Sequence, residues 1–196
     1  MTMPGHVAIF GGSFNPPHFG HMFAALYVLE TRPVDALWLV PTFHHPFEKS
    51  LESFAARFEM CGLVASALGA RVRVSDIEAT LGGASRTLRT MERLGEDFPD
   101  TRFSLVIGGD LVHEVDGWHG GAELRARADF IVVRRSGHPA AAGGTDGPAL
   151  PMPGISSTEV REALGRGEDV SGWVPRSVLD YIASRGLYGF APPARE

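Results

Sequence analysis

Cysteine is almost absent from this sequence of 196 residues, and so are long apolar runs and any excess of basic residues. The single cysteine, Cys61, cannot form an intramolecular disulfide, and a zinc site built from cysteines is equally excluded. The longest uninterrupted apolar run covers residues 22–29, which is far too short to cross a bilayer. The 18 basic and 23 acidic residues give a net charge of −5. Duplex DNA and membrane surfaces are therefore disfavoured as partners, whereas a small anionic ligand remains compatible with a locally positive site.

The composition is that of a folded domain, with 44% apolar and 21% charged residues. The length suits one domain, which we place at residues 1–190, with a C-terminal helical part at about 155–188 and a short tail at 191–196. Residues 1–6 lack the basic start of a secretory signal, and a strand-like stretch follows at once. We therefore expect a cytoplasmic protein.

The 24 glycines and 14 prolines divide the chain into alternating strand-like and helix-like stretches. Short apolar stretches predict strands at 6–10, 35–40, 72–74, 103–107 and 130–133. Helical periodicity and stop signals predict helices at 20–31, 51–68, 85–94, 156–164 and 175–185, and a loop rich in Gly, Ala and Pro at 137–154.

This alternation predicts the α/β class: a single-domain, Rossmann-like, doubly wound and mostly parallel sheet with helices on both faces. Ligands of such sheets bind beyond the carboxyl ends of the strands. The loops at 11–21, 41–49, 108–119 and 154–161 are therefore the places to search for a site.

The first of these loops favours a phosphate ligand. Gly11 and Gly12 let backbone amides approach a ligand closely, and the following helix directs its positive end to the same place. The loop matches neither the P-loop pattern nor Gly-x-Gly-x-x-Gly. His18 and His21 could be ordinary surface histidines or metal ligands, but a helix N-terminus repels cations and no third ligand is near in sequence. We interpret them as donors to a phosphate whose charge grows during reaction.

The loop at 154–161 has a similar design. Ser156 and Glu159 form a capping box that predicts a well-defined helix start. Ser157, Thr158 and Arg161 could then hold the outer phosphates of a triphosphate, although an ordinary capped helix with a solvated arginine is the alternative.

Taken together, these strings resemble a known family. Residues 11–21, GGSFNPPHFGH, are similar to the first signature of the nucleotidyltransferase superfamily with a His-x-Gly-His motif, and residues 155–161, ISSTEVR, resemble its second signature. Further features resemble the branch of bacterial nicotinate mononucleotide adenylyltransferases, so that the resemblance spans residues 7–188. These features are Ser85-Arg86-Thr87, Ile107-Gly108-Gly109-Asp110 followed by Trp118, the string at 132–137, and the ending at 181–188.

The resemblance implies three groups of site residues. The catalytic residues are His18, His21 and Arg161. The ATP-binding residues are Gly11, Gly12, Ser13, Phe14, His21, Gly108, Asp110, Ile155, Ser156, Ser157, Thr158 and Arg161. The residues that bind the second substrate are Asn15, Thr42, His45, Lys49, Arg86, Thr87, Trp118, His119 and Arg134.

Some of these positions have simpler interpretations or depart from the family. Asp110 could be a helix N-cap, Trp118 a core residue and Arg134 a solvated strand end. The family usually has Pro-Pro-His-Lys after the second strand, and the string FHHPFEK at 43–49 leaves the assignment between His45 and Lys49 open. Arg86 stands where the family usually has tyrosine.

The implied reaction is adenylyl transfer from ATP to nicotinate mononucleotide, giving deamido-NAD and pyrophosphate by direct in-line attack. Mg²⁺ would be held by the phosphates and water rather than by protein ligands. ATP and the mononucleotide are the expected partners, with no nucleic acid and no membrane, and a homo-oligomer is left open. The alternatives are nicotinamide mononucleotide or phosphopantetheine as acceptor, or a nucleotide-binding sensor without catalysis.

Overall fold

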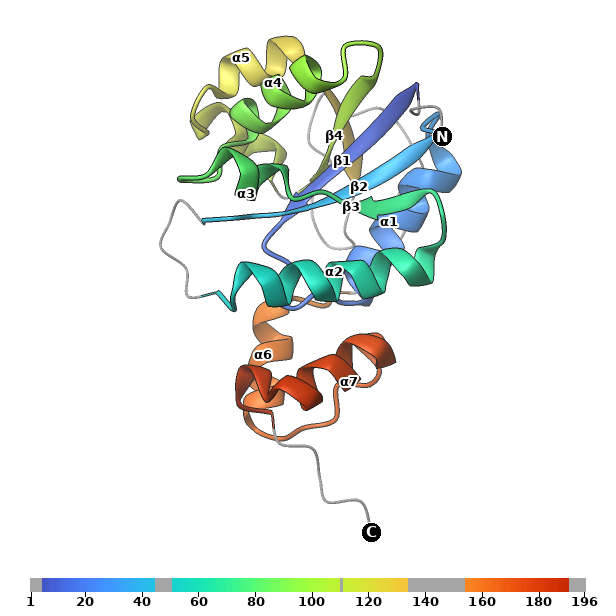
Figure 1. The fold of residues 1–196 in the computed structure, drawn as a ribbon, viewed down its shortest axis with the longest axis vertical. Coiled ribbons are helices and arrows are strands. Elements are labelled where there is room, and N and C mark those ends of the chain that lie inside the picture. Colours follow the sequence, from blue (N-terminus) through green and yellow to red (C-terminus); the bar gives the residue numbers. More distant parts are fainter. Residues whose placement is uncertain (1–4, 45–50, 110, 134–153, 191–196) are drawn as a thin grey trace.

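The computed structural model describes residues 5–44, 51–109, 111–133 and 154–190. Five parallel strands form one sheet in the order β3-β2-β1-β4-β5, as Figure 1 shows. The strands are β1 (His6–Gly12), β2 (Ala36–Pro41), β3 (Val72–Val74), β4 (Arg102–Gly108) and β5 (Asp129–Val133). The prediction of a doubly wound parallel sheet is confirmed.

The helices alternate with these strands. They are α1 (Phe19–Thr31), α2 (Phe54–Leu68), α3 (Ile77–Leu81), α4 (Thr87–Asp97), α5 (Gly121–Arg127), α6 (Ser157–Gly165) and α7 (Arg176–Arg185), with 3-10 turns η1 (Val112–Gly117) and η2 (Leu187–Gly189).

Each face of the sheet has its own hydrophobic core, because alternate side chains of a strand point to opposite faces. On one face, strand residues such as Ala8 and Leu39 pack with α1, α2, α6 and α7. On the other face, Ile9 and Trp38 pack with α3, α4, α5 and η1. All six residues of β2 are buried, as expected of a central parallel strand covered on both sides.

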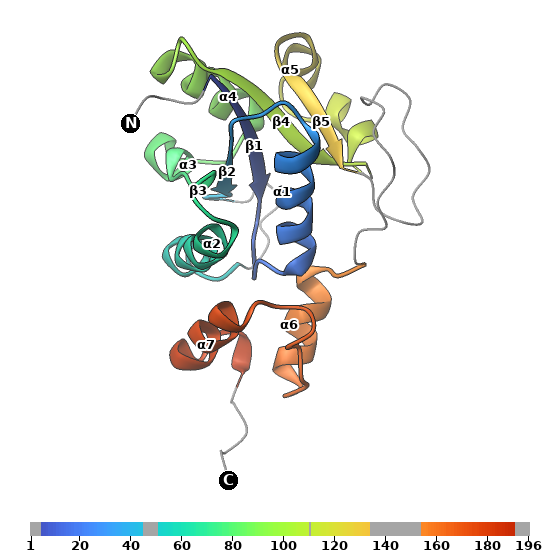
Figure 2. The ribbon, with the colours of Figure 1, turned by 90° about the vertical axis from the view of Figure 1, so that its right-hand side faces the viewer.

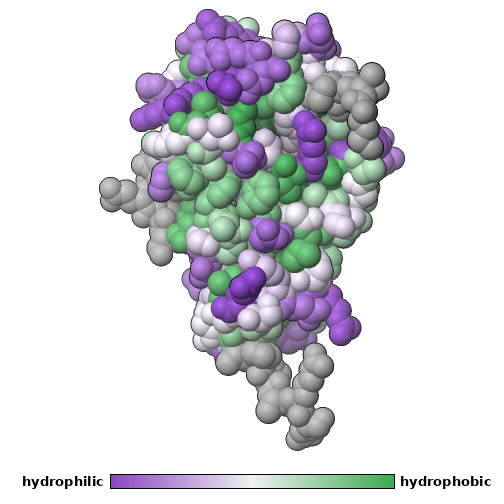
Figure 3. Space-filling view, in the orientation of Figure 1, coloured by the Kyte–Doolittle hydropathy of each residue, from purple (hydrophilic) through white to green (hydrophobic). Residues whose placement is uncertain are grey.

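Helices α6 and α7 lie beyond the carboxyl ends of the strands (Figure 2), where ligands of such sheets bind. The segment that carries α6 and α7 therefore folds back against the loop that follows β1. Hydrophilic residues gather instead over α4 and α5 (Figure 3), where Arg127 pairs with Glu92 and Glu123.

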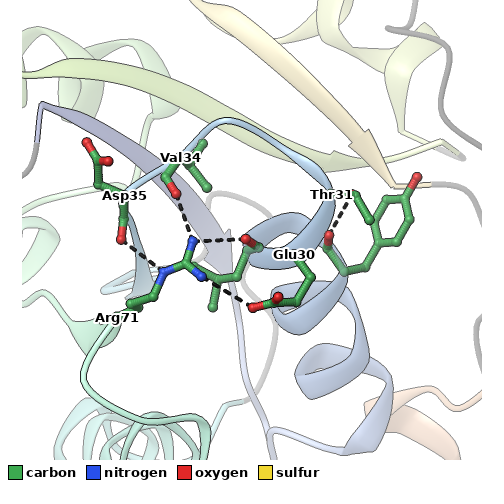
Figure 4. Close-up of polar contacts among 7 residues, drawn as sticks. Glu30, Thr31, Val34, Asp35 and Arg71 are labelled. Carbon is green, nitrogen blue, oxygen red and sulfur yellow. Dashed lines mark hydrogen bonds and ion pairs between the residues drawn. The ribbon is translucent and has the colours of Figure 1, made fainter.

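The amino end of the sheet is fastened by one arginine (Figure 4). Arg71 donates to the carbonyl oxygens of Leu29 (2.9 Å), Val34 (2.8 Å) and Asp35 (3.2 Å), and its Nη1 lies 3.2 Å from Glu30. These bonds satisfy carbonyl groups at the end of α1 and in the turn to β2, and the last carbonyls of a helix accept no hydrogen bond within the helix itself.

Three sequence predictions of element boundaries were wrong by two or three residues. Helix α4 was predicted at 85–94 but runs from Thr87 to Asp97. The pair Gly11-Gly12 does not end β1 but continues it, opposite Val40 and Pro41 of β2. Helix α2 begins at Phe54 rather than at residue 51, because the hydroxyl of Ser53 accepts a hydrogen bond from the amide of Ala56 and caps it.

The sequence analysis also missed α3, η1 and α5. Helix α3 has only five residues, too few for a period to show. Helix α5 begins after Gly120, which has a φ of 70° and looks like a breaker in the sequence, although here it serves as the N-cap. The loop predicted at 137–154 lies outside the described residues except for its last position. Among the helices described, none is both long and apolar enough to cross a membrane.

Candidate active site

The site begins where β1 ends. Strand β1 brings Gly12 to the carboxyl edge of the sheet, and the amide of Thr42, just after β2, donates to the carbonyl oxygen of Gly12 at 2.9 Å. Phe14 follows with a φ of 47°, a left-handed conformation that is rare for a bulky residue, and its side chain is buried. The chain therefore turns sharply here before it enters α1 at Phe19.

The two histidines of this loop stack on one another at the start of α1. His18 is the N-cap residue and His21 the third residue of the helix, and their ring centroids are 3.8 Å apart. The amide of His18 donates to Nδ1 of His21 at 3.2 Å, so the neutral form of His21 carries its proton on Nε2. Nε2–H is thus the group that His21 can offer to an anion.

Gly20 lets the two rings approach each other. A Cβ at this position would lie 2.9 Å from Cε1 and Nδ1 of His18, which is closer than real Cβ contacts. Because His18 is only 2% exposed, its ring has little room to move away. The glycine of the His-x-Gly-His string is therefore required by packing.

The second predicted signature lies directly against this loop. The hydroxyl of Ser157 donates to the carbonyl oxygen of Pro16 at 2.9 Å, and Nη1 of Arg161 donates to that of Asn15 at 2.8 Å. Ser156 caps α6, and its hydrogen bonds hold the pKa of Glu159 below its ordinary value. The structure therefore brings together two strings that are 141 and 146 residues apart at these contacts.

The comparisons with known proteins agree with this arrangement. The Cytidylyltransferase-like family matches residues 9–163. A probable nicotinate-nucleotide adenylyltransferase of Anaeromyxobacter dehalogenans (strain 2CP-1) is 46% identical over 185 residues, which are 93% of this chain and 96% of the relative. A protein of Myxococcus xanthus with the same name is 39% identical over 183 residues, covering 93% and 94%. The chain belongs to the nicotinate-nucleotide adenylyltransferase family.

Solved structures agree on the fold. A Plasmodium falciparum nicotinic acid mononucleotide adenylyltransferase complexed with NaAD superposes with a TM-score of 0.81 at 21% identity, covering 94% of this chain and 98% of that one. A putative nicotinate-nucleotide adenylyltransferase from Vibrio parahaemolyticus gives 0.72 at 24% identity, covering 93% and 94%. The family resemblance found in the signatures is confirmed, and the family consists of nucleotidyltransferase enzymes.

The residues predicted to bind the second substrate that the structure describes come, apart from Asn15, from three segments. Thr42 follows β2, Arg86 and Thr87 open α4, and Trp118 and His119 follow η1. Trp118 packs against the second core while remaining partly exposed, and His119 is exposed. Arg86 is exposed, and within the described parts of the chain no hydrogen bond or ion pair of its guanidinium is found.

Further predicted residues are Gly108, Asn15 and four residues that the structure does not describe. Gly108 ends β4 at the same edge of the sheet as Gly12, whereas Asp110, Arg134, His45 and Lys49 lie outside the described residues. Asn15 is 1% exposed, and its Oδ1 accepts hydrogen bonds from the amide of Glu52 (3.1 Å) and the hydroxyl of Tyr188 (2.9 Å). These bonds give the Asn15 side chain a structural role, and its contact with substrate stays a prediction.

Sequence reasoning missed two charged residues behind the site, Arg57 and Glu78. Arg57 lies in the buried stripe of α2 together with Met60, Cys61 and Val64, at helical spacing. A charged residue on an apolar face was a usable signal for a buried functional group. Glu78 lies in α3, which is too short for any such pattern to show.

Cys61 does not take part in the chemistry suggested here. Its side chain is fully buried in α2, and burial raises the pKa of the thiol well above its usual range. The thiol therefore stays protonated and inert. Among the residues that the structure describes, no group of three or more His, Cys, Asp or Glu side chains could hold a metal ion.

Proposed function

We propose that this chain transfers the adenylyl group of ATP to nicotinate mononucleotide, giving deamido-NAD and pyrophosphate. The observation that carries the proposal is the contact of Ser157 and Arg161 with the loop that bears His18 and His21. One cluster at the carboxyl edge thus offers imidazole, hydroxyl, guanidinium and helix amide donors, a set suited to a triphosphate. Curated relatives that match 93% of this chain are named probable nicotinate-nucleotide adenylyltransferases.

The transfer needs no covalent intermediate. An oxygen of the mononucleotide phosphate attacks the α-phosphorus of ATP, and the bond from that phosphorus to the bridging oxygen of the β-phosphate breaks. Negative charge grows on the leaving pyrophosphate, so the protein's task is to position the reactants and stabilise this charge.

The residues take the following roles in the proposal. Nε2–H of His21 donates to a phosphate oxygen as charge develops, and His18 acts beside it. Arg161 turns from the carbonyl oxygen of Asn15 to the outer phosphates of bound ATP. Loop amides at Gly12 to Phe14 contribute further donors.

Mg²⁺ belongs to the proposal as an ion that arrives with the triphosphate. Phosphate oxygens and water would hold the ion, since Mg²⁺ commonly binds through substrate phosphates rather than through a dedicated set of protein ligands. It would neutralise charge on the phosphates. A cytoplasmic location stays a prediction, and the homo-oligomeric state stays open.

Nicotinate is the preferred acceptor in this proposal, because its carboxylate meets backbone amides. Helix α4 starts at Thr87, its first turn holds no acidic residue, and its first amides lack intrahelical acceptors. By resemblance, amides near Thr87 and His119 bind the carboxylate while the ring lies on Trp118. The NH₂ group of nicotinamide would meet these donors unpaired, at a cost of roughly 1–3 kcal/mol.

The test is release of pyrophosphate by the purified protein with ATP and one of three acceptors: nicotinate mononucleotide, nicotinamide mononucleotide or phosphopantetheine. We expect a preference of at least about tenfold in kcat/KM for nicotinate mononucleotide over the amide. Equal or better use of another acceptor contradicts the acid-specific proposal. Binding of ATP without pyrophosphate release from any acceptor would indicate a sensor.

A further inference from the structure

One peptide group beside the site lies between two oppositely charged side chains. The carbonyl oxygen of Thr42 accepts a hydrogen bond of 2.8 Å from Nη2 of Arg57, and the amide of the next residue, Phe43, donates to Oε2 of Glu78 at 3.0 Å. The same amide lies 2.9 Å from the hydroxyl oxygen of Ser85. Each end of this peptide dipole thus faces a charge of the sign that stabilises it.

Arg57 uses the rest of its guanidinium on two other backbone segments. Nη1 donates to the carbonyl oxygen of Ser13 at 2.9 Å, and Nε donates to that of Glu52 at 2.9 Å. Arg57 is 1% exposed, and burial lowers its pKa, while the charge of Glu78 acts in the opposite direction. Its rigid fork of donors therefore joins the first loop, the loop after β2 and the segment before α2.

Glu78 connects the loop after β2 to the segment that begins α4, which is predicted to bind the mononucleotide. Its carboxylate accepts hydrogen bonds from the hydroxyls of Ser85 and Thr90, the latter at 3.3 Å. The amide of Ser85 in turn donates to the carbonyl oxygen of His44 at 2.9 Å. Glu78 thus ties the loop after β2 to the start of α4.

We propose that Arg57 and Glu78 are positioning residues, which hold the Thr42–Phe43 peptide group and thereby set the spacing between the ATP-side loop at 11–15 and the acceptor-side segment at 84–87. The inference rests on the proposed function, because in-line attack requires the two substrates in contact. A misplacement of about 1 Å can cost about 10² in rate. Neither side chain touches a substrate in this scheme, since both act through the loops.

The first test replaces Glu78 by glutamine in the full chain. Glutamine keeps an oxygen for the amide of Phe43 but removes the charge and one acceptor. We expect KM for nicotinate mononucleotide to rise about tenfold while KM for ATP stays within about twofold. We also expect the amide hydrogen of Phe43 to exchange with deuterium about tenfold faster, as followed by NMR. A merely structural role would lower stability without separating the two KM values.

The second test compares two arginines that serve equal numbers of carbonyl groups. Arg57→Met removes the donors to Ser13, Thr42 and Glu52, whereas Arg71→Met removes three donors at the opposite end of the sheet. We expect Arg57→Met to lower kcat/KM for both substrates by about 10². Arg71→Met should lower the melting temperature and leave kcat/KM within about twofold. If Arg57→Met does not fold, the Glu78→Gln results decide alone.

The outcomes separate the positioning role from the function itself. If wild type releases pyrophosphate from ATP and nicotinate mononucleotide, unchanged KM values and an unchanged Phe43 exchange rate in Glu78→Gln overturn the positioning role alone. If wild type releases none with any acceptor, the proposed function fails. The role of Glu78 at the Phe43 amide is then judged by amide exchange, where an unchanged rate overturns it.

Discussion

Arg57 and Arg71 do the same chemical work at opposite ends of the sheet. Each donates to three backbone carbonyl oxygens, over 2.8–2.9 Å for Arg57 and 2.8–3.2 Å for Arg71. Arg57 is 1% exposed, whereas the side chain of Arg71 is 46% exposed and pairs with Glu30. The carbonyls that Arg71 holds belong to the end of α1 and to the turn before β2, and those that Arg57 holds belong to loops around the candidate site. We therefore expect the bonds of Arg57 to affect activity and those of Arg71 to affect stability alone, because ligands of parallel sheets bind at the carboxyl edge.

The largest expected effect contrasts two histidines, His21 near the start of α1 and His6 at the start of β1. His21→Ala removes a donor aimed at a developing phosphate charge, so turnover should fall by about 10²–10³ with the fold intact. His6 lies at the amino end, where its ring nitrogens bond to the carbonyl oxygen of Pro33 and the hydroxyl of Ser104. His6→Ala should lower the melting temperature without slowing turnover. Turnover of His21→Ala close to that of wild type would remove this residue from the mechanism.

The next effect concerns the packing of the histidine pair. In Gly20→Ala, the new methyl group would meet the ring of His18 and push it out of place, so turnover should fall about tenfold to a hundredfold. Gly62→Ala is the matched control, because a Cβ at this position in α2 meets nothing within 4 Å. That variant should be more stable by about 0.5–1 kcal/mol and fully active. Steady-state kinetics and thermal melts of both variants check this contrast, and normal turnover of Gly20→Ala would refute the packing argument.

A smaller effect is expected from Arg161, because it binds in the ground state as well as in the transition state. Arg161→Ala should raise KM for ATP about tenfold and lower turnover as well. Arg176→Ala, which removes an exposed arginine from α7, serves as the control and should change neither value. An unchanged dependence on ATP concentration in Arg161→Ala would show that this arginine only braces the first loop.

The smallest expected effect is a pH dependence of the melting temperature that arises from the carboxyl group of Glu78. Burial raises the pKa of this carboxyl above its ordinary value of 4.5, so the folded protein binds its proton more tightly than the unfolded chain does. This contribution favours folding below pH 4.5 and is lost as the pH rises through the raised value. The melting temperature of Glu78→Gln relative to wild type should therefore improve as the pH rises above 4.5, the ordinary pKa value of the carboxyl. Glu59→Gln, which removes an exposed carboxylate of α2, should show no such trend.

The local features of this protein could be predicted from the sequence because they depend on neighbours in the chain. Apolar runs such as 36–40 predicted buried strands, and the Ser156–Glu159 pair predicted the start of α6 within one residue. The glycine-rich turn and the two signature strings indicated the family and predicted a site at the carboxyl edge of the sheet. The sequence did not predict the five-residue helix α3, because so short a segment shows no helical period.

Only the tertiary structure decided how the site is held together. The bonds from Arg161 to Asn15, from Arg57 to Ser13 and from Phe43 to Glu78 join residues that are 146, 44 and 35 positions apart. No periodicity or capping pattern specifies such pairs, because they form only when the strands have aligned and the loops meet at one edge. Composition and local pattern thus determined the elements and the kind of site. The packing of the sheet determined which charged side chains, such as Arg57, were buried beside the candidate site.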